Sequence, residues 1–245
     1  MYLLALYSLC ISCNQHQSQH QVQYQGKALY TIQVDKERLA HYLTEGSDNS
    51  YINAIYKFSN GAQFSLLLDT DRSVFRFNSK PDDHEIKAKG VSAFLIFFHL
   101  SGTIYSDLDK GKSYQLKEAG SATHLLALPL EGINWNITTE SKMHGKYKVY
   151  KATAILKEKR NLHLTAWFCR DVPTKFGPGV YAGLPGLIMD LTGDQQTKGV
   201  LKFNLKLETL TKGNQDITIP FDTYKVYNQQ ESDEIYRKLN GNARP

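Results

Sequence analysis

The sequence predicts a mainly β protein, an antiparallel meander that forms a curved sheet or a half-open barrel and ends in a short helix. Its 245 residues include 15 Tyr and 11 Phe, bulky side chains that pack well on a pleated sheet. Short runs of alternating apolar and polar residues recur between turns rich in Gly, Asn and Asp. One segment near the C-terminus has clear helical spacing. The alternative architecture is a β-sandwich.

The first half of the chain is expected to begin with a strand over 28–34, whose side chains alternate in polarity. Segments 51–58 and 62–68 are predicted to pair as a hairpin across Ser59-Asn60-Gly61, because Asn-Gly accepts the positive φ angles of a tight turn. Segment 73–78 would then add the next strand of the meander.

The middle of the chain contains an apolar run and a second hairpin. Periodicity does not decide whether residues 94–100 form a buried strand or a short buried helix. Segments 102–107 and 112–116 flank Asp109-Lys110-Gly111, a typical turn sequence, so they are predicted to pair.

The second half is expected to contain four more strands before the final helix. These strands are predicted over 135–138, 147–155, 162–168 and 199–208. In the helix, Ser232 is the expected cap and Gly241 the expected stop.

The N-terminus predicts export from the cytoplasm to the periplasm or outer membrane. Residues 1–12 form an apolar run that is too short to span a bilayer and is typical of a signal peptide. Ile11-Ser12-Cys13 is similar to the end of a lipobox, so the sequence leaves open a plain signal cleaved near Ser12 or a lipid anchor on Cys13. The predicted organisation is a signal over 1–13, a disordered polar tether over 14–25 and a single β-rich domain over 26–245.

Known catalytic motifs are absent from the sequence, including the G-x-S-x-G elbow, the H-E-x-x-H helix and the phosphate-binding loop. Cys169 could pair with one of eight His as a nucleophile, but a lone Cys after an aromatic strand is more often a small buried hydrophobe. Asp190 and Asp194 could form a carboxylate pair, although Asp194 is expected in a turn over 192–195. We therefore predict no catalytic residue, metal site or cofactor.

The formal net charge of +5 is spread along the chain, and nucleic acid is not an expected partner. The most basic neighbourhood, with Tyr between its cations, is similar to some binders of single-stranded nucleic acid. In a hairpin, however, a solvated face is the expected interpretation, and an exported protein could equally turn this face to anionic lipid head groups. The neighbourhood contains Lys142, Lys146, Lys148, Lys151, Lys157, Lys159 and Arg160, with Tyr147 and Tyr150 between them.

A set of short strings in the second half of the chain resembles the GLPGLI family in order and spacing. The strings are Trp135-Asn136-Ile137, Gly145-Lys146-Tyr147, Lys151-Ala152, Ala166-Trp167-Phe168, Val172-Pro173, Gly177-Pro178 and Gly183-Leu184-Pro185-Gly186-Leu187-Ile188. The resemblance implies an exported envelope protein of Gram-negative bacteria whose biochemical role is not established. Val149 stands where relatives often have Cys, which puts in doubt any role that would need that thiol here.

The physical properties of the last string predict a structural role. Gly183 and Gly186 permit backbone angles closed to other residues, and Pro185 stiffens the turn between them. Leu184, Leu187 and Ile188 are expected to enter the core. Gly177 and Pro178 would form a second bend upstream, so residues 175–191 are predicted to be an ordered loop that leads into a strand.

Three functions follow as hypotheses. The first is a non-enzymatic binding or accessory protein that holds an apolar ligand or lipid in the curved sheet. The second is a hydrolase that uses Cys169 or the loop carboxylates, and the third is a partner of an outer-membrane transporter. The first predicts a concave face lined by Phe64, Leu66, Phe75, Phe77, Trp135 and Trp167.

Overall fold

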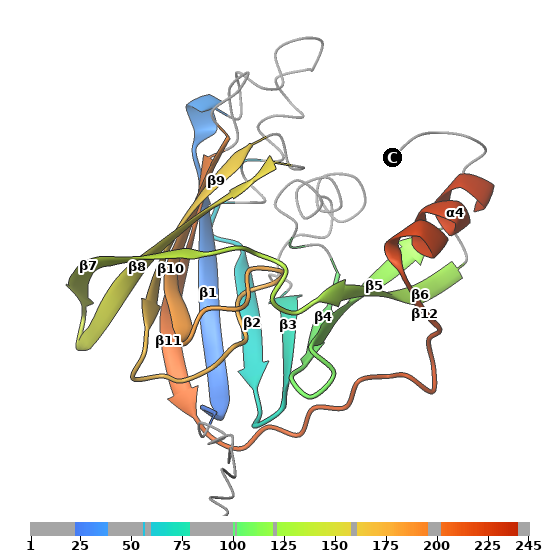
Figure 1. Ribbon diagram of the computed structural model, residues 1–245, viewed down its shortest axis with the longest axis horizontal. Helices are drawn as coiled ribbons and strands as arrows, with labels where there is room; N and C mark the ends of the chain where they lie inside the picture. Colours follow the sequence, from blue (N-terminus) through green and yellow to red (C-terminus); the bar gives the residue numbers. More distant parts are fainter. Residues whose placement is uncertain are drawn as a thin grey trace, which may run out of the picture.

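A computed structural model shows that the described residues form one sheet of twelve strands and a C-terminal helix (Figure 1). The structure describes residues 23–38, 56, 60–78, 100, 102–119, 122–157, 161–195 and 202–239. The strands in the first half are β1 (Gly26–Val34), β2 (Gln63–Leu68), β3 (Arg72–Asn78), β4 (Ile104–Asp107), β5 (Lys112–Ala119) and β6 (Ala122–Pro129). Those in the second half are β7 (Asn136–His144), β8 (Tyr147–Leu156), β9 (Leu162–Cys169), β10 (Leu187–Gln195), β11 (Lys202–Lys212) and β12 (Val226–Tyr227), before the helix α4 (Gln229–Leu239).

The strand order is β12-β6-β5-β4-β3-β2-β1-β11-β10-β9-β8-β7. Neighbouring strands are antiparallel except for β12, which pairs in parallel with β6. The sheet does not close into a barrel, and the described strands do not divide into two sheets. The predicted curved β-sheet with a C-terminal helix is therefore confirmed, and the sandwich alternative was wrong.

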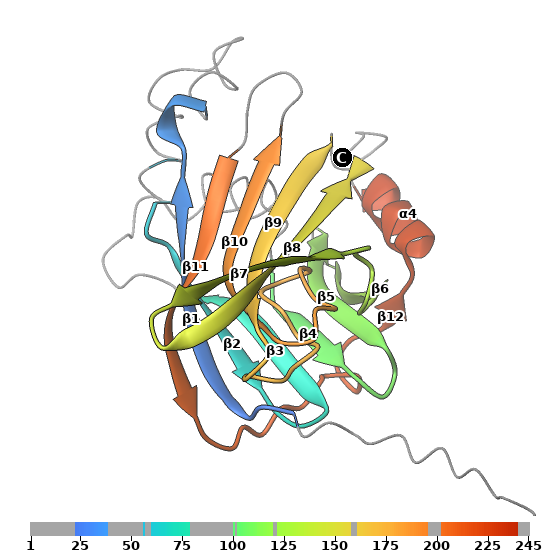
Figure 2. The ribbon, with the colours of Figure 1, turned by 60° about the vertical axis from the view of Figure 1, so that its left-hand side comes forward.

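The connection from β6 to β7 requires the sheet to be strongly curved. These strands hold the second and twelfth places in the sheet, so ten spacings of about 4.8 Å would separate them by ~48 Å in a flat sheet. Residues 130–135 join the two strands. Counted from the last residue of β6 to the first residue of β7, this segment reaches at most about 25 Å when fully extended. Figures 1 and 2 show this connection crossing from one part of the sheet to the other.

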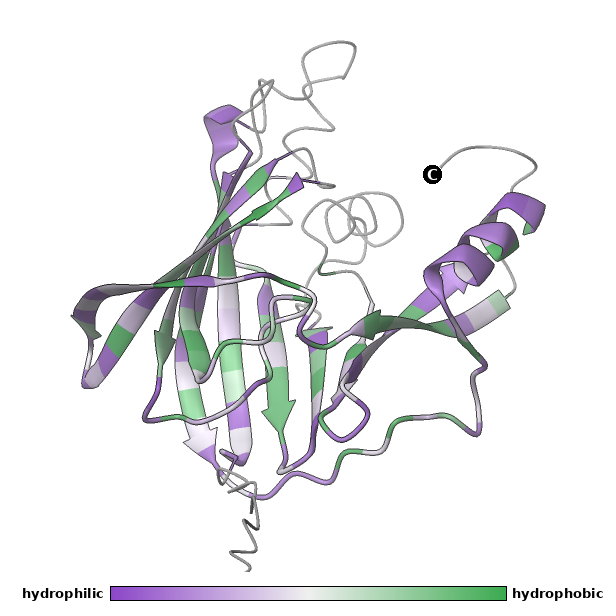
Figure 3. Ribbon diagram, in the orientation of Figure 1, coloured by the Kyte–Doolittle hydropathy of each residue, from purple (hydrophilic) through white to green (hydrophobic). Residues whose placement is uncertain are grey.

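Strand register defines one apolar face, which we call the inner face. Tyr30 is paired with Phe64 on β2. Ile32 is paired with Leu205 on β11, and Leu205 is also paired with Leu191 on β10. Paired residues share a face of a sheet, so these side chains form one continuous core. In Figure 3 the apolar residues gather in the central strands, whereas α4 is mostly hydrophilic.

Segment 51–58 of the predicted hairpin lies outside the described residues except for Tyr56. Its predicted partner, β2, pairs with β1 on one side and with β3 on the other, so the pairing predicted across Ser59-Asn60-Gly61 was wrong. Tyr56 is helical, and its carbonyl accepts a hydrogen bond from the Asn60 N–H (2.8 Å). The apolar run 94–100 lies outside the described residues except for Leu100, which is fully buried.

Most of the other expected strands are present, with shifted bounds. The hairpin of β4 and β5 and the strands β8 and β9 lie where the alternation placed them. β6 was not predicted, and β7 is longer than the expected segment 135–138. The turn expected over 192–195 is part of β10, because its residues pair with β9.

The helix α4 begins earlier than predicted, and its cap is Asn228. The side chain of Asn228 accepts a hydrogen bond from the Glu231 N–H (3.0 Å), and the Glu231 carboxylate accepts one from the Asn228 N–H (2.8 Å). This reciprocal pair is a capping box. Ser232, the expected cap, is buried in the first turns of the helix.

The fold also includes the end of the segment predicted to be a tether. The Tyr24 N–H donates to the Pro173 carbonyl (2.8 Å), and the Gln25 side chain donates to Asp69 (2.8 Å). The predicted signal and most of the tether, with Cys13, lie outside the described residues. Within the part of the chain that is described, no helix has the length and apolar character needed to cross a membrane.

Candidate functional site

The loop between β9 and β10 carries the Gly183 to Ile188 string and is closed by backbone hydrogen bonds. The Gly183 N–H donates to the Lys175 carbonyl (2.9 Å), and the Leu187 N–H donates to the Val172 carbonyl (3.0 Å). The side chains of Leu184, Leu187 and Ile188 are buried, whereas Pro185 is exposed. The apolar residues of the string therefore belong to the core.

Two glycines of this loop are required because other backbone atoms approach them closely. A Cβ on Gly186, where φ is 158°, would lie 2.1 Å from the Cys169 carbonyl oxygen. A Cβ on Gly177 would lie 1.7 Å from the Tyr181 carbonyl oxygen. Pro178, which follows Gly177, accepts a hydrogen bond from the Tyr181 N–H (3.3 Å). No side chain fits at either glycine without moving the backbone.

The same loop holds the connection between β6 and β7 in place. The indole N–H of Trp135 donates to the Ala182 carbonyl (2.9 Å). Lys175 forms an ion pair with Glu131 (2.8 Å), and Glu131 also lies against Gly183. The string therefore packs on the segment that joins the two distant parts of the curved sheet.

The residues predicted to face a ligand occupy different environments. Phe64, Leu66 and Phe75 are fully buried in the core, and the rings of Phe64 and Phe75 stack at 5.3 Å. Phe77 and Trp135 are only half-buried at its margin. Of these five residues, only Phe77 and Trp135 retain surface that a ligand could touch.

Trp167 was grouped with these residues, but it lies on the opposite face of the sheet. Its neighbour Ala166 pairs with Leu191 on the inner face, so Trp167 points outward because side chains alternate along a strand. The ammonium group of Lys142 lies 4.0 Å from the centre of the indole ring. Alternation along the strand shows which residues share a face with Trp167. It does not show whether that face of the strand belongs to the inner or the outer face of the sheet.

Cys169 has the environment of a structural residue. Its side chain is fully buried in the apolar cluster. Burial raises the pKa of its thiol despite hydrogen bonds with the backbone of Asp171 and Val172. A thiol that stays protonated is a poor nucleophile.

The two carboxylates near the string do not converge. Asp190 and Asp194 are four residues apart on β10, about 13 Å along the strand. Asp190 accepts a hydrogen bond from Asn204 (2.8 Å), and Asp194 is paired with Arg38. Among the described residues, no group of three or more His, Cys, Asp or Glu is arranged to hold a metal ion.

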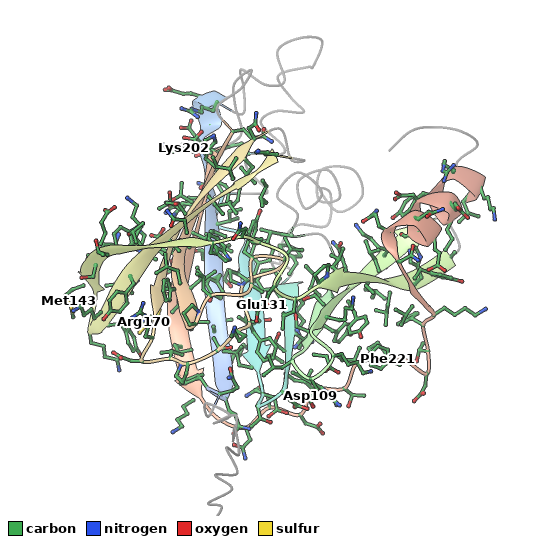
Figure 4. All side chains as sticks on the ribbon, in the orientation of Figure 1. Asp109, Glu131, Met143, Arg170, Lys202 and Phe221 are labelled. Carbon is green, nitrogen blue, oxygen red and sulfur yellow. The ribbon has the colours of Figure 1, made fainter. Side chains whose placement is uncertain are left out.

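The end of the sheet formed by β7 and the β7–β8 turn is the least covered part of the strands. Among the described strands, β7 pairs with β8 alone, and most of its residues are exposed. Met143 is 63% exposed and Ile137 is 40% exposed. Figure 4 places Met143 and Arg170 together at this end. We call it the open end of the sheet, comprising residues 136–148 and Arg170.

Four exposed cations surround the open end, and each lies over an aromatic ring. The pairs are Lys142 with Trp167 (4.0 Å), Lys146 with Tyr147 (5.2 Å), Lys148 with Tyr150 (5.5 Å) and Arg170 with Tyr150 (4.3 Å). The sequence located the lysines of this group but missed Arg170, Met143 and Ile137. Arg170 is separated from the others along the chain, so only the pairing of β8 with β9 brings it to them.

The opposite end of the sheet is covered, and it contains a buried polar contact. Nε2 of His124 on β6 lies 2.8 Å from the Ser232 hydroxyl on α4, and both residues are buried. Among the residues that the structure describes, none forms a hydrogen bond with Nδ1 of His124. Burial, and to a lesser extent the charge of Lys117, lowers the pKa of this imidazole. The contact therefore joins α4 to the sheet through a neutral histidine.

Together these features define a β-rich protein built on one open, strongly curved sheet. A family model described as "Protein of unknown function (Porph_ging)" matches residues 156–190, which include β9 and the Gly183 to Ile188 string. The match covers a small part of the chain, and its description assigns no activity. No curated protein sequence matches the chain.

The fold is similar to part of PNGF-II, which has been solved in two crystal forms. The C2 form has a TM-score of 0.55 and 10% identity over 88% of this chain, and the P21 form has 0.55 and 9% over 88%. The chain spans about a third of the length of PNGF-II, at 33% and 34% of the two chains. At this identity the likeness extends to the fold alone.

A LolA superfamily protein from Nitrosomonas europaea is a more distant neighbour. It has a TM-score of 0.34 and 7% identity over 82% of this chain and 90% of that chain. A likeness at this level carries no argument about function.

Proposed function

We propose that the protein is a non-enzymatic binding or accessory module of the bacterial envelope, and that it binds through the open end of its sheet. The observation that carries the proposal is the contrast between the two ends. One end is covered by β12 and α4, whereas within the described part of the chain β7 has a free edge and exposes Ile137 and Met143. Exposed apolar side chains beside a free strand edge are typical of interaction sites.

The free edge of β7 is partly protected, which locates the accessible segment. Register with β8 is irregular between Ile137 and Ser141, and such a bulge hinders strand addition. Regular pairing resumes over Ser141–His144. A protein partner, such as an outer-membrane protein, would add a strand beside this segment.

Export is the second part of the proposal, and it rests on the first residues of the chain. The apolar run over 1–12 is typical of a signal peptide, and Cys13 is a candidate for lipidation. The resemblance to the GLPGLI family supports the same location.

A binding role has more support than the hydrolase alternative. Cys169 is buried with a raised pKa, and Asp190 and Asp194 have separate partners. The string and its neighbours pack the β9–β10 loop on the connection between β6 and β7, which supports a structural role for the string.

A second candidate is an apolar ligand or lipid held on the inner face. The half-buried Phe77 and Trp135 favour it, because both lie at the margin of the core. Phe64, Leu66 and Phe75 would contribute only if part of the core opened, because they are fully packed.

Site-specific photocrosslinking in cells tests the open end. A benzophenone amino acid replaces Met143 in one variant and Asp222 in another, an exposed residue far along the chain from β7. We expect crosslinked adducts at position 143 and few at 222. Equal and weak crosslinking at both positions would disprove binding of a protein partner at the open end.

Native mass spectrometry of the protein purified from envelope fractions tests the second candidate. A retained apolar mass that is lost in Phe77→Ser and Trp135→Ser would support the inner-face ligand. A protein that carries no such mass after extraction in several mild detergents would argue against it. The same spectra would show a lipid on Cys13.

A further inference from the structure

We infer that the open end of the sheet docks on a bilayer surface containing anionic phospholipid, with the β7–β8 turn entering the head-group region. This inference names the partner of the surface proposed above and rests on that proposal. It follows from the charge of this end, from the rings beneath the charges and from the exposed side chain at the tip.

The first argument is charge complementarity. Lys142, Lys146, Lys148 and Arg170 are all exposed, and within the described part of the chain none of them forms an ion pair with a carboxylate. The nearby Lys151 is different, because Glu140 neutralises it at 2.9 Å. Lys and Arg near an anionic leaflet are each attracted to it, and the attraction adds up over a cluster.

The second argument is that the cations occupy both faces of the hairpin. Register places Lys142 on the outer face, opposite Val149, and places Lys148 and Met143 on the inner face. A flat surface could meet only one of these faces. A hairpin that enters the head groups edge-on lets phosphates reach both faces at once.

The third argument is the tip itself. Met143 is the most exposed of the large apolar residues in the described chain, at 63%. It lies between Lys142 and the turn at Gly145, where a Cβ would meet no atom within 4 Å. An apolar side chain flanked by Lys and Tyr suits the boundary between head groups and acyl chains.

The cation–π contacts favour phosphate head groups over single-stranded nucleic acid. Binders of single strands stack bases on free aromatic faces. Here Lys142 already lies over Trp167, and Lys148 and Arg170 lie over Tyr150. The rings hold the cations in place and leave the charges outward, which suits a layer of phosphates.

Vesicle cosedimentation tests the inference with the full chain carrying Cys13→Ser, so that no lipid anchor contributes. Vesicles of phosphatidylcholine alone are compared with vesicles containing about 30% phosphatidylglycerol. We expect at least ten-fold stronger binding to the anionic vesicles, and this preference should weaken from about 0.05 to about 0.5 M salt as screening increases. Any binding by the apolar N-terminus would be common to both kinds of vesicle.

A charge-matched pair of variants locates the binding surface. Replacing Lys142, Lys146, Lys148 and Arg170 with Gln should lower anionic binding at least ten-fold. The control replaces four other exposed lysines with Gln and should lower it no more than about two-fold. The control lysines are Lys27, Lys202, Lys206 and Lys212, which lie on β1 and β11; Figure 4 shows Lys202 away from Arg170.

A fluorescent variant provides a second readout that does not remove any charge. Met143→Trp should gain emission intensity and shift to shorter wavelength on anionic vesicles, and brominated acyl chains should quench the added emission. Unchanged emission at position 143 would overturn the inference, as would equal loss of binding in the two charge variants.

The outcomes separate the inference from the function on which it rests. Crosslinks from position 143 to a protein, with no preference for anionic vesicles, would overturn membrane docking and keep the open end as a binding site. Binding to a single-stranded oligonucleotide as tight as that to anionic vesicles would also overturn it. Absence of both crosslinks and vesicle binding would disprove both proposals.

Discussion

The hydroxyl of Tyr30 on β1 donates a hydrogen bond of 2.8 Å to the carbonyl oxygen of Ile188, although 158 residues separate the two. Pairing between β10 and β11 begins at Asp190, and register with β9 shifts between Ile188 and Asp190. The Ile188 carbonyl therefore lies where β10 does not yet pair with β11, and Tyr30 satisfies it. Tyr30 is fully buried, and burial raises the pKa of its phenol, so it remains a donor.

Loss of this hydroxyl should destabilise the fold. Tyr30→Phe leaves the buried Ile188 carbonyl without its donor, and we expect the free energy of unfolding to fall by about 1–3 kcal/mol. Urea denaturation followed by circular dichroism measures it. In Tyr236→Phe, where the hydroxyl donates to the Glu118 carbonyl in an exposed contact, we expect a loss below about 1 kcal/mol. Equal losses in both variants would contradict the structural role of Tyr30.

A side chain at Gly186 should disrupt the loop. In Gly186→Ala the methyl group would overlap the Cys169 carbonyl oxygen, so we expect a loss of about 3 kcal/mol or more in the free energy of unfolding, or failure to fold. Gly213→Ala is the matched control, because its Cβ would meet no atom within 4 Å, and it should be close to neutral. A thermal melt of each variant gives the comparison. A stable Gly186→Ala protein would mean that the close approach is not required.

Cys169 should react with thiol reagents only when the protein unfolds. The measurement uses Cys10→Ser and Cys13→Ser together, so that Cys169 is the only thiol in the chain. Because the side chain is fully buried and its pKa is raised, we expect labelling in native buffer at least 100-fold slower than in urea. Rapid labelling of the native protein would revive the hydrolase hypothesis.

The stability of the protein should fall as the pH drops below about 6.5, through His124. The environment of the ring includes Lys117 on β5, Tyr227 on β12, and Ser232 and Tyr236 on α4. Burial lowers the pKa of His124 from 6.5, so the unfolded chain takes up the proton first. The stabilising contribution of His124 is fully present above its pKa in the unfolded chain. It is lost as the pH falls through its lower pKa in the folded protein.

Chemical denaturation between pH 7.5 and pH 5, values that bracket the ordinary histidine pKa of about 6.5, measures this contribution. His124→Gln should have a flatter pH profile than the wild-type protein over this window. The comparison of the two profiles removes the contribution of the other histidines. Parallel profiles would show that His124 does not titrate differently in the two states.

The strands that the sequence predicted correctly depend on local signals. β4 and β5 flank Asp109-Lys110-Gly111, and β8 and β9 alternate clearly. β6 was missed because its central residues, including Leu125 and Leu126, are buried on both faces and do not alternate. A strand covered on both sides lacks the period of two on which the prediction relied.

The candidate site was predicted less well than the fold. The sequence identified most cations of the open end, but their role depends on the position of β7 at the edge of the sheet. Trp167 was assigned to the concave face because alternation cannot relate the faces of separate strands. Met143 has no sequence signal of its own, since an apolar residue in a strand is normally expected to be buried.

By itself, the sequence determined the β character of the chain and several of its turns. These features depend on the φ angles and side-chain alternation of neighbouring residues, which are encoded locally. Only the tertiary structure decided that β6 and β7, consecutive in the chain, lie ten places apart and that β7 is left uncovered. Strand order depends on pairing between distant segments, and short-range alternation is compatible with many such pairings.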